Sequence, residues 1–306
     1  MKEKSFKSKI KKDFTRNKWK YFIVIPVIIY LLIFAYKPMY GLIIAFKRFR
    51  PQLGIMDSPW VGLQNFKSLF RDFYFTRSLR NTFTISLLSI LLSFPAPVLL
   101  ALLLNEVKVK WFKKTVQTIT YMPHFISMVV ICGMIISFTQ TNGIITDIVV
   151  FFGGERANLL AQTKFFYPIY IISGIWQQVG WDSIIYLAAL SGIDQEQYEA
   201  AKVDGAGRLK QMIYITLPGL IPTISMLLVL KLGKVLGVGY EKILLLYQPI
   251  TYEVADVIST YSYRKAFVNA DYGFSTAIGL FNSVVNIVFL LASNKLSKKM
   301  GQSGLF

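Results

Sequence analysis

The sequence has few charged residues for its length. Charged side chains make up 16% of the 306 residues, whereas 54% are hydrophobic, and the mean hydropathy is +0.48. Soluble domains carry roughly 25% charged residues, so this chain has too few charges to solvate a globule of its size. The composition excludes a disordered chain and a water-soluble enzyme core, and it indicates an integral membrane protein.

Cysteine and histidine each occur once. Cys132 has no possible partner within the chain, which excludes a secreted domain held by disulfides. His124 is the only histidine, and a zinc site needs several ligands in register, so we expect no metal site. No Ser/His/Asp set and no converging pair of carboxylates is visible, so we expect no catalytic residues either.

Six apolar windows meet or approach the length of a membrane span, which is roughly 20 residues. They are Trp19–Tyr36, Thr82–Leu104, Val116–Phe138, Phe166–Leu190, Gly219–Val238 and Phe274–Ala292. We therefore predict an all-α integral membrane protein with six transmembrane helices. Its single membrane domain (19–294) would follow a basic N-terminus (1–18) and precede a short tail (295–306).

The basic residues predict the orientation. Nine Lys and Arg fall within the first 20 residues, just ahead of an apolar run. Attraction to anionic lipids of the inner leaflet explains them, so they do not indicate nucleic-acid binding. Segments Lys108–Lys114 and Lys295–Lys299 are also basic, as cytoplasmic loops usually are. No small-x-small cleavage site follows Phe34–Lys37, so the first span reads as an uncleaved anchor. We predict a multi-pass protein of the bacterial cytoplasmic membrane with both termini cytoplasmic.

Residues 37–80 depart from this charge rule, because they would lie outside the cell yet carry eight basic residues against two acidic ones. The basic residues are Lys37, Lys47, Arg48, Arg50, Lys67, Arg71, Arg77 and Arg80, and the acidic ones are Asp57 and Asp72. We keep the predicted orientation because the three other basic segments support it.

The loop 191–218 (SGIDQEQYEAAKVDGAGRLKQMIYITLP) predicts two helices joined by a glycine turn at the inner membrane surface. Asp194 is a good N-cap for the first helix. Gly205 or Gly207 would end that helix, because glycine adopts positive φ at little cost. A second helix over Arg208 to Thr216 would lead into the fifth span. A short helix so placed can fit a groove on a soluble partner and pass rigid-body motion into the spans it joins.

This loop resembles the EAA loop of bacterial binding-protein-dependent ABC importer permeases at every fixed position, namely Glu199, Ala200, Ala201, Gly205, Ile215, Leu217 and Pro218. Other stretches are similar to the carbohydrate-uptake branch of that family, especially the type that imports larger oligosaccharides and polysaccharide fragments. They are YGLIIAF (40–46), SPWVGLQNF (58–66), LRNT (79–82), YLAALSGID (186–194), LLLYQP (244–249) and STAIGLFNSVVN (275–286).

The resemblance implies a type I ABC importer permease fold, with two membrane subunits, two ATPase subunits and an external solute-binding lipoprotein. In this branch the second permease is usually a paralogue, which implies a heterodimer. Carried over to this chain, the residues that couple to the ATPase are Glu199, Ala200, Ala201, Asp204, Gly205, Ile215, Leu217 and Pro218. The phosphate-binding pattern G-x-x-x-x-G-K-[ST] does not occur in the sequence. ATP and Mg²⁺ are therefore expected on the partner ATPase, and this chain is expected to bind no cofactor and to have no enzymatic activity.

Polar residues inside the fourth and fifth predicted spans are candidates for the substrate pathway. An ionisable group at such depth costs about 3 kcal/mol, so it normally faces a partner or a wet cavity. The candidates are Trp176, Gln177, Gln178, Trp181, Asp182, Lys231 and Lys234. Indoles can stack on the C–H faces of sugars, while amides and carboxylates bond their hydroxyls. The alternative is that Asp182 pairs with a lysine and a glutamine bonds a neighbouring helix, so that these groups only hold the bundle together.

Taken together, the sequence predicts the permease subunit of an ATP-driven bacterial importer, which forms an oligosaccharide pathway with a second permease. Two other readings stay open. The same architecture could import an amino acid, a peptide or an anion. A protein of a different class, a membrane scaffold or enzyme, could use the loop to bind some other cytosolic protein.

Overall fold

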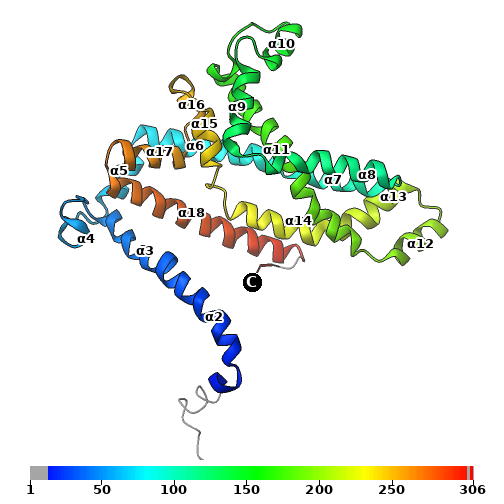
Figure 1. The fold of residues 1–306 in the computed structure, drawn as a ribbon, viewed down its shortest axis with the longest axis horizontal. Coiled ribbons are helices and arrows are strands. Elements are labelled where there is room, and N and C mark those ends of the chain that lie inside the picture. Colours follow the sequence, from blue (N-terminus) through cyan, green and yellow to red (C-terminus); the bar gives the residue numbers. More distant parts are fainter. Residues whose placement is uncertain (1–12, 302–303, 306) are drawn as a thin grey trace, which may run out of the picture.

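The computed structural model describes residues 13–301, 304 and 305, and nearly all of them lie in helices (Figure 1). The described chain contains no regular strand and has only two isolated β-bridges, Lys47–Trp60 and Arg50–Gly54. The predicted all-α fold class is confirmed.

Five helical segments of the described chain are long and apolar enough to cross a membrane. They are Lys18–Phe46 (α2, η1, α3, η2), Phe73–Glu106 (α6, η3, α7), Met128–Phe151 (α9, α10), Arg208–Leu232 (α13, η6, α14) and Tyr272–Lys299 (α18). A sixth long helix, α11 (Thr163–Ser191), has 29 residues, which reach about 43 Å at the rise of an α-helix. Polar residues near its middle make α11 less apolar than the other five.

Turns interrupt several of these segments. The parts are α2 (Lys18–Leu31), η1 (Leu32–Tyr36), α3 (Lys37–Met39), η2 (Tyr40–Phe46), α6 (Phe73–Leu88), η3 (Ser89–Ser93), α7 (Pro95–Glu106), α9 (Met128–Thr139), α10 (Ile144–Phe151), α13 (Arg208–Gln211), η6 (Met212–Thr216) and α14 (Leu217–Leu232). The connecting helices are α4 (Gly54–Asp57), α5 (Gln64–Arg71), α8 (Lys110–Tyr121), η4 (Met122–Phe125), η5 (Leu159–Ala161), α12 (Gln195–Val203), α15 (Tyr240–Leu246), η7 (Pro249–Thr251), α16 (Tyr252–Ala255), α17 (Ile258–Tyr263) and η8 (Arg264–Val268).

The third predicted window, Val116–Phe138, is divided between two helices. α8 ends at Tyr121, the turn η4 contains Pro123, and the Ser127 hydroxyl then caps α9. Proline has no N–H to donate and disfavours helix in the residue before it, so Pro123 separates the two helices. Figure 1 shows α9 running at a steep angle to α8.

Three other windows also differ from the observed helical segments in their bounds, and the fifth differs at both ends, because that segment begins at Arg208 and not at Gly219. The first helical segment continues to Phe46, and the second begins at Phe73. The fifth ends at Leu232, because the glycine-rich segment 233–239 (GKVLGVG) follows it. Glycine is the least favourable residue for a helix interior after proline, so the chain leaves the helix there.

Helix α11 lies at the centre of the molecule and packs against α7, α8, α14 and α16. Among the residues that the structure describes, buried apolar side chains form three clusters. The first joins α9, α11 and α15, the second joins α5, α6, α17 and α18, and the third joins α7, α11 and α14. Because α11 belongs to two of them, its polar residues are held between packed walls.

The first part of this first segment, α2 and η1, stands apart from the core, whereas η2 packs against α18 and its Ala45 belongs to the second cluster. None of the residues in its most apolar window is buried, and Figure 1 shows α2 running away from the other helices. Its side chains are therefore left to contact lipid or another protein.

A buried ion pair fixes the helices between the fifth and sixth spans. Arg264 donates to both carboxylate oxygens of Asp256, at 2.8 and 2.5 Å, and Asp256 is fully buried. Ser78 of α6 also donates to Asp256, at 3.2 Å, and the Asn81 amide donates to the backbone oxygen of Asp256. A buried carboxylate needs several such partners, and here they tie α6 to α16 and α17, beside α15.

Candidate functional site

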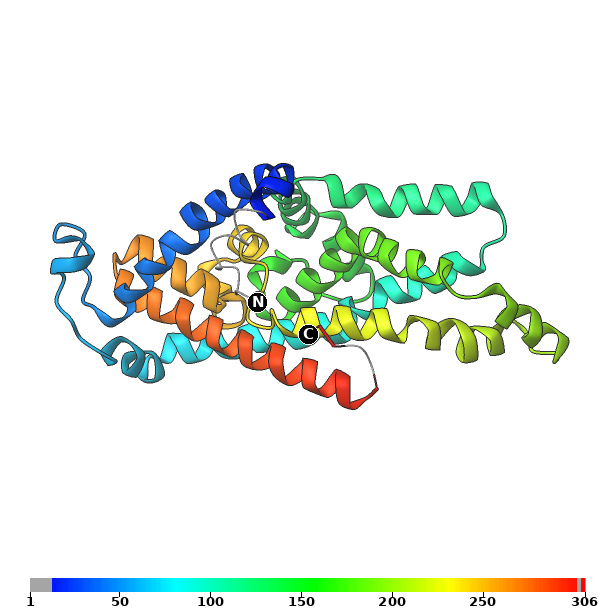
Figure 2. The same ribbon diagram turned by 90° about the horizontal axis from the view of Figure 1, so that it is seen from below.

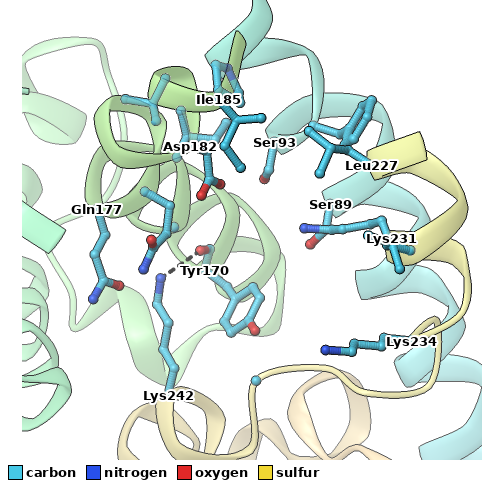
Figure 3. A pocket seen from close by; sticks show the side chains of 18 of the residues that line it. Ser89, Ser93, Tyr170, Gln177, Asp182, Ile185, Leu227, Lys231, Lys234 and Lys242 are labelled. Atoms are coloured by element: carbon cyan, nitrogen blue, oxygen red, sulfur yellow. Dashed lines mark hydrogen bonds between the residues drawn. The ribbon is translucent and has the colours of Figure 1, made fainter. Parts of the chain in front are cut away.

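A cavity of about 510 Å³ lies between the second span, α11, α14 and α15 (Figure 3). Its polar lining consists of Ser89, Ser93, Tyr170, Gln177, Gln178, Asp182, Tyr186, Lys231, Lys234 and Lys242. A second, smaller cavity of about 270 Å³ shares Lys231 and Lys234 with the first. Both lysines therefore border open space on more than one side.

The cavity carries three lysines and one carboxylate. Lys231 and Lys234 come from the end of α14 and the residues just after it, and Figure 3 shows them across the cavity from Asp182 on α11. Within the described chain Asp182 forms no ion pair with a lysine. At least two ammonium groups are thus left without a carboxylate partner of their own.

Lys242 enters the cavity from α15, which lies between the fifth and sixth spans. It is 5% exposed, and its Nζ donates to the backbone oxygen of Tyr170 at 3.1 Å and lies 4.9 Å from the centre of the Tyr170 ring. Burial lowers the pKa of Lys242 to about 8, because a desolvated ammonium group is disfavoured. At neutral pH the side chain is still predominantly cationic.

Five of the seven predicted pathway residues line this cavity: Gln177, Gln178, Asp182, Lys231 and Lys234. The two tryptophans do not. Trp176 lines a separate, almost wholly apolar pocket of about 500 Å³ beside α9 and α10. The Trp181 ring stacks on the His124 ring, with centroids 4.3 Å apart and planes 1° from parallel.

His124 also contacts the cavity wall directly. Its Nδ1 lies 2.9 Å from Oε1 of Gln178, so the histidine holds one end of an amide that lines the cavity. The backbones cross closely beside it, since a Cβ on Gly180 would lie 2.1 Å from the backbone oxygen of Thr120. Only glycine permits α8 and α11 to approach so closely.

The sequence did not predict five of the polar lining residues: Ser89, Ser93, Tyr170, Tyr186 and Lys242. Ser89 and Ser93 are four residues apart in the second span, so a search for polar residues on one helix face could have found them. Lys242 lies between the fifth and sixth spans, and nothing in the sequence places that segment against α11.

The loop 191–218 forms an exposed elbow, and we use that name for these residues. The side chain of Asp194 accepts a hydrogen bond from the Glu196 N–H at 3.0 Å and caps α12. Gly205 has φ +73°, so the predicted N-cap and the predicted glycine turn are both confirmed. No residue of α12 is buried, and Val203 at its end is 89% exposed.

The elbow residues implied by the EAA resemblance lie in two groups. Glu199, Ala200, Ala201, Asp204 and Gly205 lie on α12 and the turn after it, whereas Ile215, Leu217 and Pro218 lie where η6 passes into α14. In both views α12 and α13 lie at one end of the molecule, the end at which α8 also begins, and α4 and α5 lie at the opposite end (Figures 1 and 2).

Comparison with known proteins identifies the family. Residues 77–302 match the family described as binding-protein-dependent transport system inner membrane component. The chain is 44% identical to the polygalacturonan/rhamnogalacturonan transport system permease protein YteP of Bacillus subtilis (strain 168), over 95% of this chain and 91% of YteP. It is 43% identical to protein LplB of the same organism, over 95% of this chain and 92% of LplB.

A solved structure also agrees over the whole fold. It is a bacterial ABC transporter involved in the import of the acidic polysaccharide alginate, with a TM-score of 0.89 and 46% identity, covering 96% of this chain and 100% of the matched chain. A second solved structure is a bacterial alginate ABC transporter in complex with an alginate pentasaccharide-bound periplasmic protein. It also has a TM-score of 0.89 and 46% identity, covering 96% of this chain and 99% of that one. The resemblance to ABC importer permeases is thereby confirmed. The chain belongs to the family of inner-membrane components of binding-protein-dependent transport systems, as a multi-pass permease subunit with no enzymatic activity of its own.

Proposed function

We propose that this permease carries an acidic oligosaccharide, one that contains uronic acid units, from an external solute-binding protein through the cavity beside α11. The observation that carries the proposal is the charge of the cavity, three lysines against one carboxylate. Unpaired ammonium groups are costly within a membrane, and a neutral sugar would not offset that cost. A uronate carboxylate would neutralise them.

The other lining residues suit the remainder of such a substrate. Gln177, Gln178 and Asp182 can bond sugar hydroxyls through their amide and carboxylate groups. Ser89 and Ser93 lie across the cavity from Asp182 (Figure 3). The matched solved transporter imports a polysaccharide described as acidic, which supports the same chemistry here. The substrate contacts proposed are therefore Lys231, Lys234 and Lys242 for carboxylates, and the amides and Asp182 for hydroxyls.

The driving ATPase is proposed to bind the elbow at Glu199, Ala200, Ala201, Asp204 and Gly205. Exposed α12 offers a projecting surface, and Ile215, Leu217 and Pro218 connect it to α14. ATP and Mg²⁺ would be held by that partner subunit, because this chain lacks the phosphate-binding loop. The elbow shares its end of the molecule with the basic segment 108–114, which supports a cytoplasmic position for both.

A second permease, expected to be a paralogue, would complete the pathway. The exposed apolar surface of the first segment supports a protein partner within the membrane. Purification of the tagged chain in mild detergent should recover an ATPase and a second six-span permease. Recovery of neither would contradict the assembly and favour a scaffold.

The substrate proposal is tested by uptake into vesicles that contain the assembled complex and are supplied with the loaded binding protein. Lys231→Gln and Lys234→Gln should each slow uptake of an acidic oligosaccharide about tenfold, the loss for one hydrogen bond to a charged group. Lys164→Gln, a change at an exposed lysine of α11 outside the cavity, should have no effect. Uptake at the wild-type rate in both cavity variants would refute the proposed pathway.

A further inference from the structure

α12 makes few contacts with the rest of the chain, which raises the question of how its motion reaches the spans. None of its residues is buried. One polar contact crosses from α12 to the fifth span: the Tyr198 hydroxyl lies 3.0 Å from the Thr216 hydroxyl. Tyr198 is half-buried on α12, and Thr216 is 1% exposed at the end of η6.

A second hydrogen bond fixes the orientation of the Thr216 hydroxyl. It donates to the backbone oxygen of Gln211 at 3.3 Å, so its oxygen is free to accept the hydrogen of Tyr198. The Gln211 side chain in turn donates to the backbone oxygen of Ala206, in the turn after α12, at 2.7 Å. One link therefore joins α12 to the end of η6, and a second joins the turn after α12 to Gln211, the last residue of α13, directly before η6.

The π turn leads directly to the cavity. η6 and α14 form one continuous helical segment that ends at Leu232, and from Thr216 to Lys231 the helix rises about 22 Å. α14 packs along α11 and α18. A shift at Thr216 would thus move the lysine side of the cavity relative to Asp182.

We infer that the Tyr198–Thr216 hydrogen bond is the contact that transmits the motion of α12 to α14. The inference rests on the proposed coupling of the elbow to an ATPase. Tyr198 does not line the cavity, so it acts as a positioning residue for α14 and does not contact the substrate. Without the bond, α12 could move with its partner while α14 stays behind, so hydrolysis would continue with less transport.

The test measures molecules of solute transported per ATP hydrolysed by the assembled complex in vesicles. Tyr198→Phe and Thr216→Val should each lower this ratio about fivefold, the effect of one neutral hydrogen bond, and the double variant should be no worse than either single one. Thr216→Ser keeps the hydroxyl and should keep the ratio. Tyr214→Phe removes a hydroxyl from a 75% exposed tyrosine of η6 and serves as the matched control.

An unchanged ratio of solute transported to ATP hydrolysed in Tyr198→Phe would refute the proposed role of this hydrogen bond. Tyr198→Phe removes only one oxygen from a half-buried side chain, so we expect this variant to assemble. It therefore tests the role of the hydrogen bond even if Thr216→Val fails to assemble. Failure of the underlying proposal gives a different result, because the wild-type complex would then show no ATPase activity stimulated by the loaded binding protein.

Discussion

At the scale of single residues, the function rests on where a few charges lie. Lys231 and Lys234 were predicted as pathway residues because charges are rare inside spans, and the structure brings them to one cavity with Asp182. The same reasoning included Trp176 and Trp181, which lie against other neighbours. Sequence spacing shows which residues share a helix face, but the face turned toward the cavity depends on how α11 packs against α7 and α14.

Lys242 gives a prediction of pH dependence. Its pKa lies near 8, so a rise in pH from 7 to 9 should remove one of the three positive charges, and uptake of an acidic oligosaccharide should fall through that range. Lys242→Arg, whose guanidinium stays charged, should flatten the profile. Lys242→Gln should be slow throughout, and a steep fall that persists in Lys242→Arg would assign the titration to another group.

The free energy of unfolding changes with pH in the opposite direction to the uptake rate. Between pH 8 and the ordinary lysine pKa, roughly 10.4, the folded chain has released this proton and the unfolded chain has not. Stability contributed by this group therefore rises with pH across that window. A loss of uptake above pH 8 with no loss of folded protein would separate the two effects.

At the scale of elements, the elbow was the part of the chain best predicted from sequence. Asp194 and Gly205 are local signals, and local signals fix where a short helix begins and ends. The third span was predicted less well. Its apolar window ran through Pro123, where the structure bends the chain between α8 and α9.

Gly205 carries a prediction for the elbow. A side chain at φ +73° is strained, at a cost of order 1–3 kcal/mol, so Gly205→Val should alter the turn and abolish stimulation of the ATPase by the loaded binding protein. Gly207→Ala, at an ordinary φ of −68° and with nothing within 4 Å of the new Cβ, is the control. Both variants should insert into the membrane as the wild type does, and normal stimulation in Gly205→Val would contradict the role of the turn.

At the scale of the whole molecule, composition alone predicted a helical membrane protein, because 16% charge cannot solvate a chain of this length. What composition could not give was the central position of α11 or the approach of α15 to it. Lys242 reaches the cavity through a contact between elements about 70 residues apart in the chain, Tyr170 and Lys242. Such long-range contacts follow from packing, which no local pattern contains.

The positive charge of the cavity can be measured as its electric potential in the assembled complex. Cys132 is the only cysteine, so Cys132→Ala combined with Ser93→Cys places a single thiol on the cavity lining. An anionic sulfonate reagent should label it about tenfold faster than a cationic ammonium reagent, after each rate is divided by that for a free thiol. The ratio should fall toward one when Lys231→Gln is added. A cationic reagent that reacts as fast as the anionic one, or faster, would contradict a pathway built for acidic sugars.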